Sequence, residues 1–94
     1  MGIFSIHALY EDIEFLKPLR IKYYAGTGFV NLKVPVLEIY IHTKTFKKAI
    51  KQLHEELLML WNDYAMEKDE NMTADAIQLK QAILEHIKII KEGK

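Results

Sequence analysis

The sequence predicts an α+β fold, in which an N-terminal antiparallel β-meander of about three strands is covered by two C-terminal α-helices. Over residues 29–34 and 36–42 the side chains alternate between two sets, which is the period of a strand with one buried face. From about residue 43 apolar residues recur at spacings of three and four, which is the period of a helix. Both prolines and three of the four glycines lie in the first half of the chain, so turns are concentrated there.

Length and composition predict one folded domain over residues 1–94. A chain of 94 residues has room for one modest core and is too short to be divided. Half of the residues are hydrophobic and 28% are charged, which is typical of folded proteins. Thirteen basic residues balance thirteen acidic ones, so the chain has no overall charge that would attract nucleic acid or anionic lipid.

The chain contains no cysteine, which excludes disulfides, thiolate zinc sites and cysteine nucleophiles. No apolar run approaches the ~20 residues that a membrane span requires. Residues 1–9 also lack the basic start and long apolar run of a signal peptide. We therefore expect a soluble, cytoplasmic protein with no cofactor and no membrane contact.

The β region is expected over about residues 1–42. Gly26 and Gly28 separate two runs rich in Ile, Val, Tyr and Phe, which indicates a hairpin. Pro35 has no amide hydrogen for a sheet, so it should mark a bend between two strands or lie on an edge. For the first eighteen residues we expect a strand over residues 2–9 and then a short helical turn over residues 10–16.

Two helices should follow, over residues 43–65 and 73–92, joined by a polar connector at residues 66–72. A threonine hydroxyl can cap each helix, because it accepts a hydrogen bond from an exposed amide; the candidates are Thr43 or Thr45, and Thr73. The first helix has one apolar stripe that should face the sheet, formed by Phe46, Ala49, Ile50, Leu53, Leu57, Leu60, Trp61 and Tyr64. The second is apolar on more than one side, so it should be deeply packed or have a partner.

The polar residues form no pattern typical of catalysis or metal binding, so we expect a protein that is not an enzyme. No two histidines have the i, i+3 or i+4 spacing that brings metal ligands together on a helix. His54-Glu55 begins like a helical zinc-protease motif, but Leu58 occupies the position of the second histidine. Ser5 lies two residues from His7, which would place both on one strand face without providing a mechanism.

Four lysines surround the start of the first predicted helix, and we call them the lysine cluster: Lys44, Lys47, Lys48 and Lys51. Cations at a helix N-terminus oppose the helix dipole at a cost of roughly a few tenths of a kcal/mol each. One interpretation is an anion-binding patch for RNA, DNA or an acidic partner. The other is that the lysine stems cover apolar surface while their charged ends reach water.

Residues 25–32 superficially resemble the signature strand of RNA-recognition motifs, in which a Gly-aromatic-Gly-aromatic pattern provides rings for base stacking. Phe29 matches one ring, but Thr27 replaces the other and Ala25 replaces the basic residue. We therefore interpret the two glycines as a hairpin turn.

A second resemblance covers residues 19–65. The segments Val34-Pro35-Val36-Leu37 and Thr45-Phe46-Lys47-Lys48-Ala49, separated by a short strand, resemble the HicB-like antitoxin domain. In that family a strand ends in a Pro-acidic-Leu turn, and a Thr-Leu-Glu-Glu-Ala sequence caps and starts the helix that covers the sheet. Four residues fall on matching positions: Pro35, Leu37, Thr45 and Ala49. Three features differ: Val36 replaces the acidic residue, no glycine follows Leu37, and two lysines replace the two glutamates.

The resemblance implies a non-enzymatic binding protein that masks a small RNA-cleaving toxin, often as a dimer. The family's appended DNA-binding module has no counterpart, since residues 73–91 have the pattern of one helix. We expect protein–protein association and a homodimer, with Tyr23 and Tyr40 as interface candidates on an exposed strand face. The alternatives are a structural or adaptor homodimer without a toxin partner, and a weak nucleic-acid binder that uses the lysine cluster.

Overall fold

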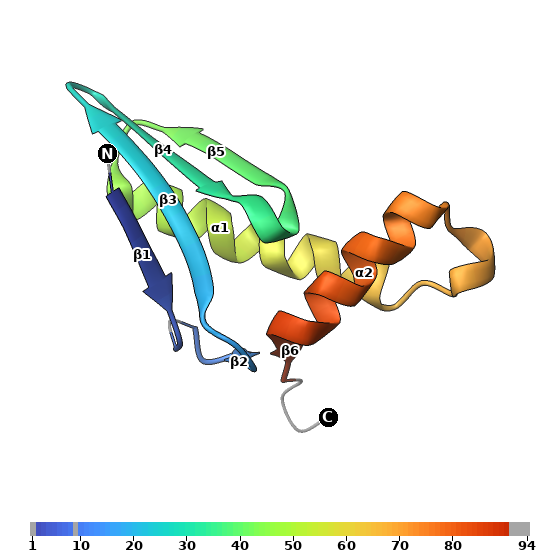
Figure 1. Ribbon diagram of the computed structural model, residues 1–94. Coiled ribbons are helices and arrows are strands. Elements are labelled where there is room, and N and C mark those ends of the chain that lie inside the picture. Colours follow the sequence, from blue (N-terminus) through green and yellow to red (C-terminus); the bar gives the residue numbers. More distant parts are fainter. Residues whose placement is uncertain (1, 9, 91–94) are drawn as a thin grey trace.

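The computed structural model describes residues 2–8 and 10–90, and it confirms the α+β fold (Figure 1). The main sheet contains β1 (Gly2–Ile6), β3 (Leu19–Gly26), β4 (Phe29–Val34) and β5 (Ile39–Thr43). Its strand order is β1-β3-β4-β5, and all neighbouring strands are antiparallel. The meander of about three strands corresponds to β3, β4 and β5, and the N-terminal strand β1 adds a fourth at the edge beside β3.

The turns lie where glycine and proline predicted them. Thr27 and Gly28 connect β3 to β4, and Gly28 has a φ of 78°, which glycine adopts without steric penalty. Between β4 and β5, Pro35–Leu37 forms a 3-10 turn, closed by a hydrogen bond of 3.1 Å from the Glu38 amide to the Pro35 carbonyl oxygen. Glu38 leaves this turn with a φ of 57°.

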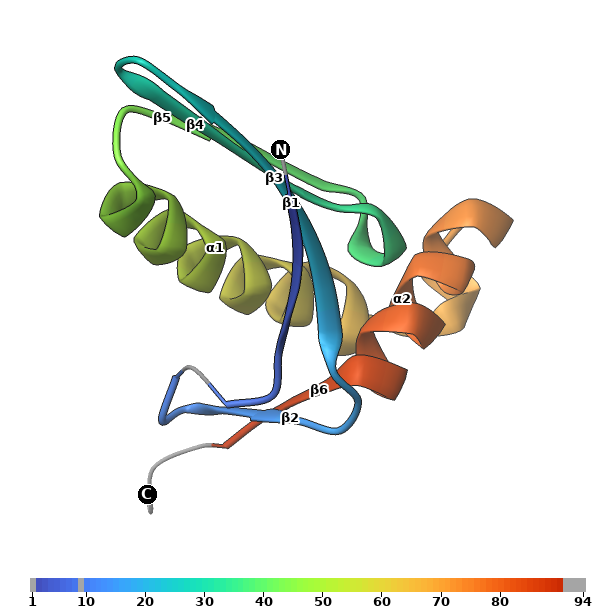
Figure 2. The ribbon, with the colours of Figure 1, turned by 60° about the vertical axis from the view of Figure 1, so that its left-hand side comes forward.

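Helix α1 (Phe46–Leu60) covers one face of the sheet, as Figure 2 shows. The Thr45 hydroxyl caps it by accepting from the Lys48 amide at 3.2 Å, so of the two cap candidates Thr45 is the one used. Its buried side chains belong to the predicted stripe: Ala49, Leu53 and Leu57. The helix continues through a wider π-helical turn at Trp61–Ala65, so the expected end near residue 65 is confirmed. No helix in the described residues is long and apolar enough to cross a membrane.

Helix α2 (Ala74–His86) is capped by the Thr73 hydroxyl, which accepts from the Ala76 amide at 3.2 Å. It packs beside the end of the sheet, against the Trp61–Ala65 and Pro35–Leu37 turns, and not across the face that α1 covers (Figure 1). The predicted helix over residues 73–92 was too long. Residues Ile87–Ile89 form strand β6 instead, and residues 91 and 92 lie outside the described part.

Strand β6 pairs with β2 (Ile13–Phe15) in a two-stranded antiparallel ribbon, with Ile13 opposite Ile89 and Phe15 opposite Ile87. The expected helical turn over residues 10–16 was therefore wrong. Ile13 and Ile87 are both buried in this ribbon. β-branched residues are well suited to a pleated, half-buried strand, and the partner strand lies more than seventy residues away in the sequence, where local periodicity gives no signal.

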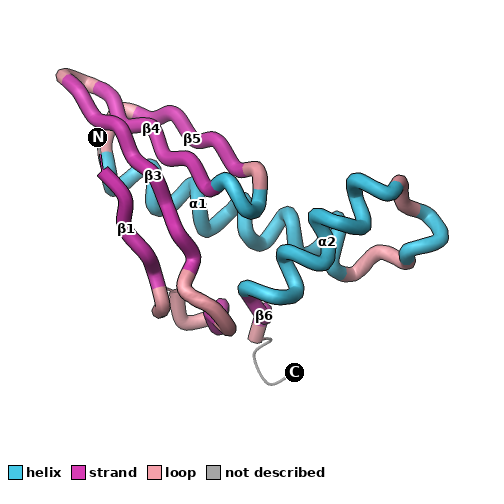
Figure 3. The backbone as a smooth tube through the Cα atoms, viewed as in Figure 1, coloured by secondary structure: helices cyan, strands magenta, loops and turns pink. Residues whose placement is uncertain are grey.

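The core lies between α1 and the sheet and is formed by one side chain in two along each strand. The largest fully buried side chains are Leu19, Ile21, Leu32, Val34, Leu37, Leu53, Leu57, Ile83 and Ile87. The alternate side chains of β3, β4 and β5 point to the opposite face, where Figure 3 shows no helix. The tertiary structure thus leaves one face of the sheet uncovered within the described residues.

Leu53→Ala should lower the free energy of unfolding by about 2 to 5 kcal/mol, because Leu53 is fully buried between α1 and the sheet. Urea denaturation followed by circular dichroism measures this change. Met59→Ala on the exposed side of the same helix is the matched control and should change the free energy by no more than about 0.5 kcal/mol. Equal midpoints for wild type and Leu53→Ala would contradict the packing described above.

Candidate binding surface

The uncovered side of the sheet is the candidate functional site, and we call it the open face. Its residues are the outward-pointing side chains of the four strands: Ile3, Ser5, Arg20, Lys22, Tyr24, Phe29, Asn31, Lys33, Tyr40 and His42. Several of them are large and apolar yet accessible, since Tyr40 is 70% exposed, Ile3 59% and Tyr24 53%. Isolated exposed apolar residues are common on proteins, but several on one sheet face indicate a contact surface.

The charges on the open face all have one sign. The four strands contain Arg20, Lys22 and Lys33 and no aspartate or glutamate. Lys22 and Lys33 lie directly opposite one another on β3 and β4. Like charges in this arrangement destabilise a sheet. Although the total charge of the chain is zero, the charges are unevenly distributed along it. Residues 15–54 contain eight basic residues and one acidic residue, Glu38.

Aromatic rings lie among these cations. The Tyr24 and Phe29 ring centroids are 5.7 Å apart, and the Phe29 and His42 rings are stacked at 6.2 Å. Phe29 lies over Gly26, where any added Cβ would collide with the ring. On the neighbouring part of the face, the Lys33 Nζ atom is 5.2 Å from the centroid of the Tyr40 ring, which is a cation–π contact. The rings and the ammonium groups are thus interleaved.

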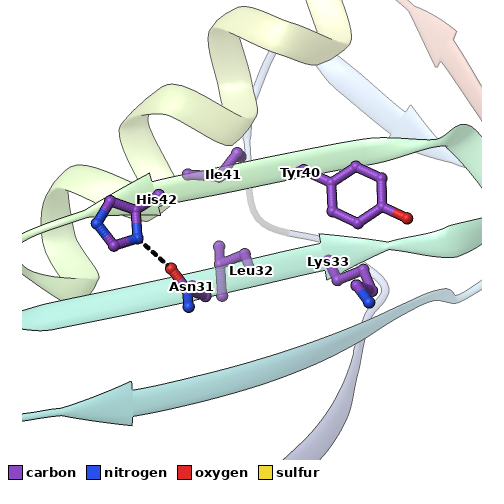
Figure 4. Close-up of a pocket in the computed structure, with 6 residues that line it drawn as sticks. All are labelled: Asn31, Leu32, Lys33, Tyr40, Ile41 and His42. Carbon is purple, nitrogen blue, oxygen red and sulfur yellow. Dashed lines mark hydrogen bonds between the residues drawn. The ribbon is translucent and has the colours of Figure 1, made fainter.

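Two shallow hollows cross the open face. One has a volume of about 370 Å³ and is lined by Asn31, Leu32, Lys33, Tyr40, Ile41 and His42 (Figure 4). The other has a volume of about 210 Å³ and is lined by Lys22, Tyr23, Tyr24, Asn31 and Lys33. Asn31 and Lys33 line both hollows, so the two hollows are neighbours on the open face. The His42 Nδ1 atom and the Asn31 Oδ1 atom are hydrogen-bonded beside the first hollow.

The structure separates the two tyrosines that the sequence analysis placed on an exposed strand face. Tyr40 is on the open face, as expected. Tyr23 instead lies half-buried on the covered face, where its ring meets Phe4 and Phe46 at centroid distances of 5.7 and 6.2 Å. The reason is the two-residue period of β3, which sends Lys22 and Tyr24 outward and therefore Tyr23 inward.

The lysine cluster lies at the start of α1, after β5, and all four of its side chains are exposed. Lys48 and Lys51 border an open depression of about 430 Å³ that also contains Glu55, Glu56, Gln52 and Met59. Carboxylates so close reduce the attraction of this surface for an anion. The open face has no acidic residue of its own, so it is the better candidate for binding an anion.

A second polar group joins the segment before β2 to α1. The His54 Nε2 atom is 2.9 Å from both carboxylate oxygens of Asp12, and the Tyr10 ring stacks on His54 at 4.3 Å. The Tyr10 hydroxyl donates to the Ile50 carbonyl oxygen at 2.6 Å. Burial, with a smaller contribution from the Asp12 charge, raises the pKa of Tyr10 to about 12. Each contact bridges the segment and the helix, so we interpret the group as an anchor.

Other polar residues considered from the sequence do not form a site. Ser5 lies opposite Arg20 on the open face, and His7 lies beyond the end of β1. Among residues 2–8 and 10–90, no three His, Asp or Glu side chains are placed to hold a metal ion. Comparisons with protein-family models, curated proteins and solved structures give no match.

Most of the open face was missed by the sequence analysis. Lys33 and Asn31 occupy outward positions of a predicted strand, and Arg20 and Lys22 belong to the run before the hairpin. A signal was present in the sequence, because between Phe15 and Leu37 there are four basic residues and no acidic one. Arg20, Lys22 and Lys33 form one surface only because strand pairing places them side by side.

The raised pKa of Tyr10 predicts a loss of stability at high pH. Tyrosine ionises near pH 10 in the unfolded chain but only near pH 12 in the folded one. The contribution of Tyr10 is therefore complete below pH 10 and is lost as the pH rises toward 12, because unfolding then releases a proton. Melting temperatures of wild type and Tyr10→Phe should converge over this range, and parallel curves would contradict the assignment. Tyr24→Phe, at an exposed position, is the matched control.

Proposed function

We propose that this chain is a non-enzymatic binding protein of the cytoplasm that holds an anionic macromolecule on its open face. The observation that carries the proposal is a sheet face with three cations, exposed aromatic rings and no carboxylate. Exposed aromatic residues are typical anchors at binding surfaces, and charges of one sign select a partner of the opposite sign.

The resemblance to the HicB-like antitoxin domain supports the binding class. The Pro35–Leu37 segment forms a turn after a strand, and Thr45 caps the helix that covers the sheet. Glu38, at the position after Leu37, has the left-handed backbone conformation that glycine favours. The resemblance implies a small toxin that is basic, and such a toxin would meet like charges on the open face. A toxin-like partner would therefore need a different surface of this chain.

Self-association remains the second candidate within the binding class. The open face is unfavourable for it, because both copies would present cations and no carboxylate there. Apolar side chains exposed elsewhere favour a homodimer, and they include Leu16, Val36, Met59, Met66, Leu84 and Ile90. Leu84 is exposed on α2, whose second apolar side suggested a partner in the sequence analysis.

The lysine pair on β3 and β4 should reduce stability in the absence of a partner. Lys22→Gln should therefore raise the free energy of unfolding by about 0.2 to 1 kcal/mol at low salt, through relief of cross-strand repulsion. Near 1 M salt the gain should disappear, because the charges are then screened. Denaturant titrations at both salt concentrations measure it, with Lys68→Gln in the connector as control. A loss of stability at low salt would show that the pair stores no repulsion.

A comparison of baits tests the proposed function. Wild type, Lys22→Glu/Lys33→Glu and Lys47→Glu/Lys48→Glu are used in affinity purification from the native host, and the complexes are weighed by native mass spectrometry. The two double variants change the charge equally on different surfaces. An anionic partner should be retained by the wild type and the helix variant and lost from the open-face variant. Retention by all three would refute the open face as the binding surface. A small basic protein on all three would favour the toxin-like candidate.

A further inference from the structure

We propose that the anionic partner of the open face is a single-stranded nucleic acid. In this arrangement bases stack on Tyr24 and Tyr40, and Lys22, Lys33 and Arg20 contact the phosphates. The inference rests on the proposed function and names the ligand class of the same surface. The proposed site is the sheet and not the lysine cluster, which the sequence analysis gave as an alternative site for nucleic acid.

The rings favour unpaired bases. Tyr24 and Tyr40 are accessible, and they stand on β3 and β5, on either side of β4. Two strand spacings separate them by on the order of 10 Å, so each ring has room for a base of its own. Proteins that bind single strands without strong sequence preference use such rings, because every base has a π-face. In a duplex those faces are already stacked on neighbouring base pairs, so the tyrosines could not stack on them.

The cations lie next to the two tyrosine rings, where the phosphates that link two stacked bases would be. Lys22 precedes Tyr24 by two residues on the same face of β3, and Lys33 faces Tyr40 across the strand pair. Lys22 and Lys33 form the repulsive pair, which a phosphate between them would convert into two attractive contacts. Arg20 lies two residues before Lys22 on the same face of β3 and adds a third cation to the row.

Asn31 provides a polar contact between the two hollows, because it lines both of them. Its Oδ1 atom is occupied by the hydrogen bond with His42. Its amide group is then oriented with the two N–H bonds available to acceptors on a base edge. Asn31 lies directly opposite Tyr24 on β3 and His42 on β5, and it lines both hollows. A base stacked on Tyr24 would therefore bring its edge toward this amide.

Fluorescence anisotropy with labelled oligouridine and oligothymidine of about 12 nucleotides tests the proposal. Wild type should bind both at low salt and bind a duplex of equal length more weakly. Tyr24→Ala and Tyr40→Ala should each weaken binding by about 5- to 150-fold, whereas Tyr24→Phe and Tyr40→Phe should retain it because the ring remains. Lys22→Glu/Lys33→Glu should weaken binding and lower the slope of log Kd against log salt by about 0.7 for each phosphate that the variant no longer neutralises.

Lys47→Glu/Lys48→Glu is the charge-matched control and should leave the affinity nearly unchanged, and circular dichroism melts establish that each variant is folded. Loss of binding in this control, with none in the tyrosine variants, would overturn the proposal and assign binding to the lysine cluster. Polyglutamate separates this proposal from the proposed function. If only polyglutamate binds, and Lys22→Glu/Lys33→Glu abolishes it, the nucleic-acid proposal fails while an anion-binding face stands. If neither probe binds at low salt, both fail.

Discussion

Helix α1 packs against one face of the sheet, and this packing determines which strand side chains are buried and which face outward. Ala49, Leu53 and Leu57 of α1 lie against the inward side chains of β3, β4 and β5, and together they form most of the buried core. Because α1 is the only long helix across the described sheet, the other face has no apolar layer to pack against. Outward positions must then be compatible with water, and in this chain they carry cations and aromatic rings instead of the mixed charges of an ordinary surface.

The cations on the outward face lower the stability of the sheet, and this is the main reason to propose a function for that face. Lys22 opposite Lys33 is unfavourable in a sheet whose neighbouring strands offer no carboxylate. Side chains that lower stability and serve no packing role are typical of binding sites, where the partner relieves the strain. The same reasoning applies less strongly to the lysine cluster, since Glu55 and Glu56 lie beside Lys48 and Lys51. Of the two basic surfaces, the sheet is the one whose strands contain no carboxylate to offset the cations.

Contacts far from the open face hold the sheet in position. The β2–β6 ribbon connects the segment after β1 to the end of α2, and the Leu16 amide extends it with a hydrogen bond of 2.8 Å to the His86 carbonyl oxygen. Tyr10, Asp12 and His54 join the same segment to α1. Strand β1 itself is held at the edge of the sheet by its antiparallel pairing with β3. The two functional interpretations concern different parts of the molecule. The HicB-like resemblance involves the Pro35–Leu37 turn and the helix capped by Thr45, whereas the proposed ligand would bind on the open face of the sheet.

The elements that depend on neighbouring residues could be predicted from the sequence. The hairpin at Gly28, the bend at Pro35, a threonine cap before each helix and the stripe of α1 follow from backbone preferences and short periods, which act within a few residues. Of Thr43 and Thr45, only the structure selects Thr45 as the first cap. The tertiary structure was needed to show that residues 87–89 leave the helix to pair with residues 13–15. It also decided the open face, because strand pairing brings Lys22, Lys33 and Tyr40 together from three strands. Such pairings depend on which distant segments can bury apolar surface against one another, and no local pattern in one sequence records that choice.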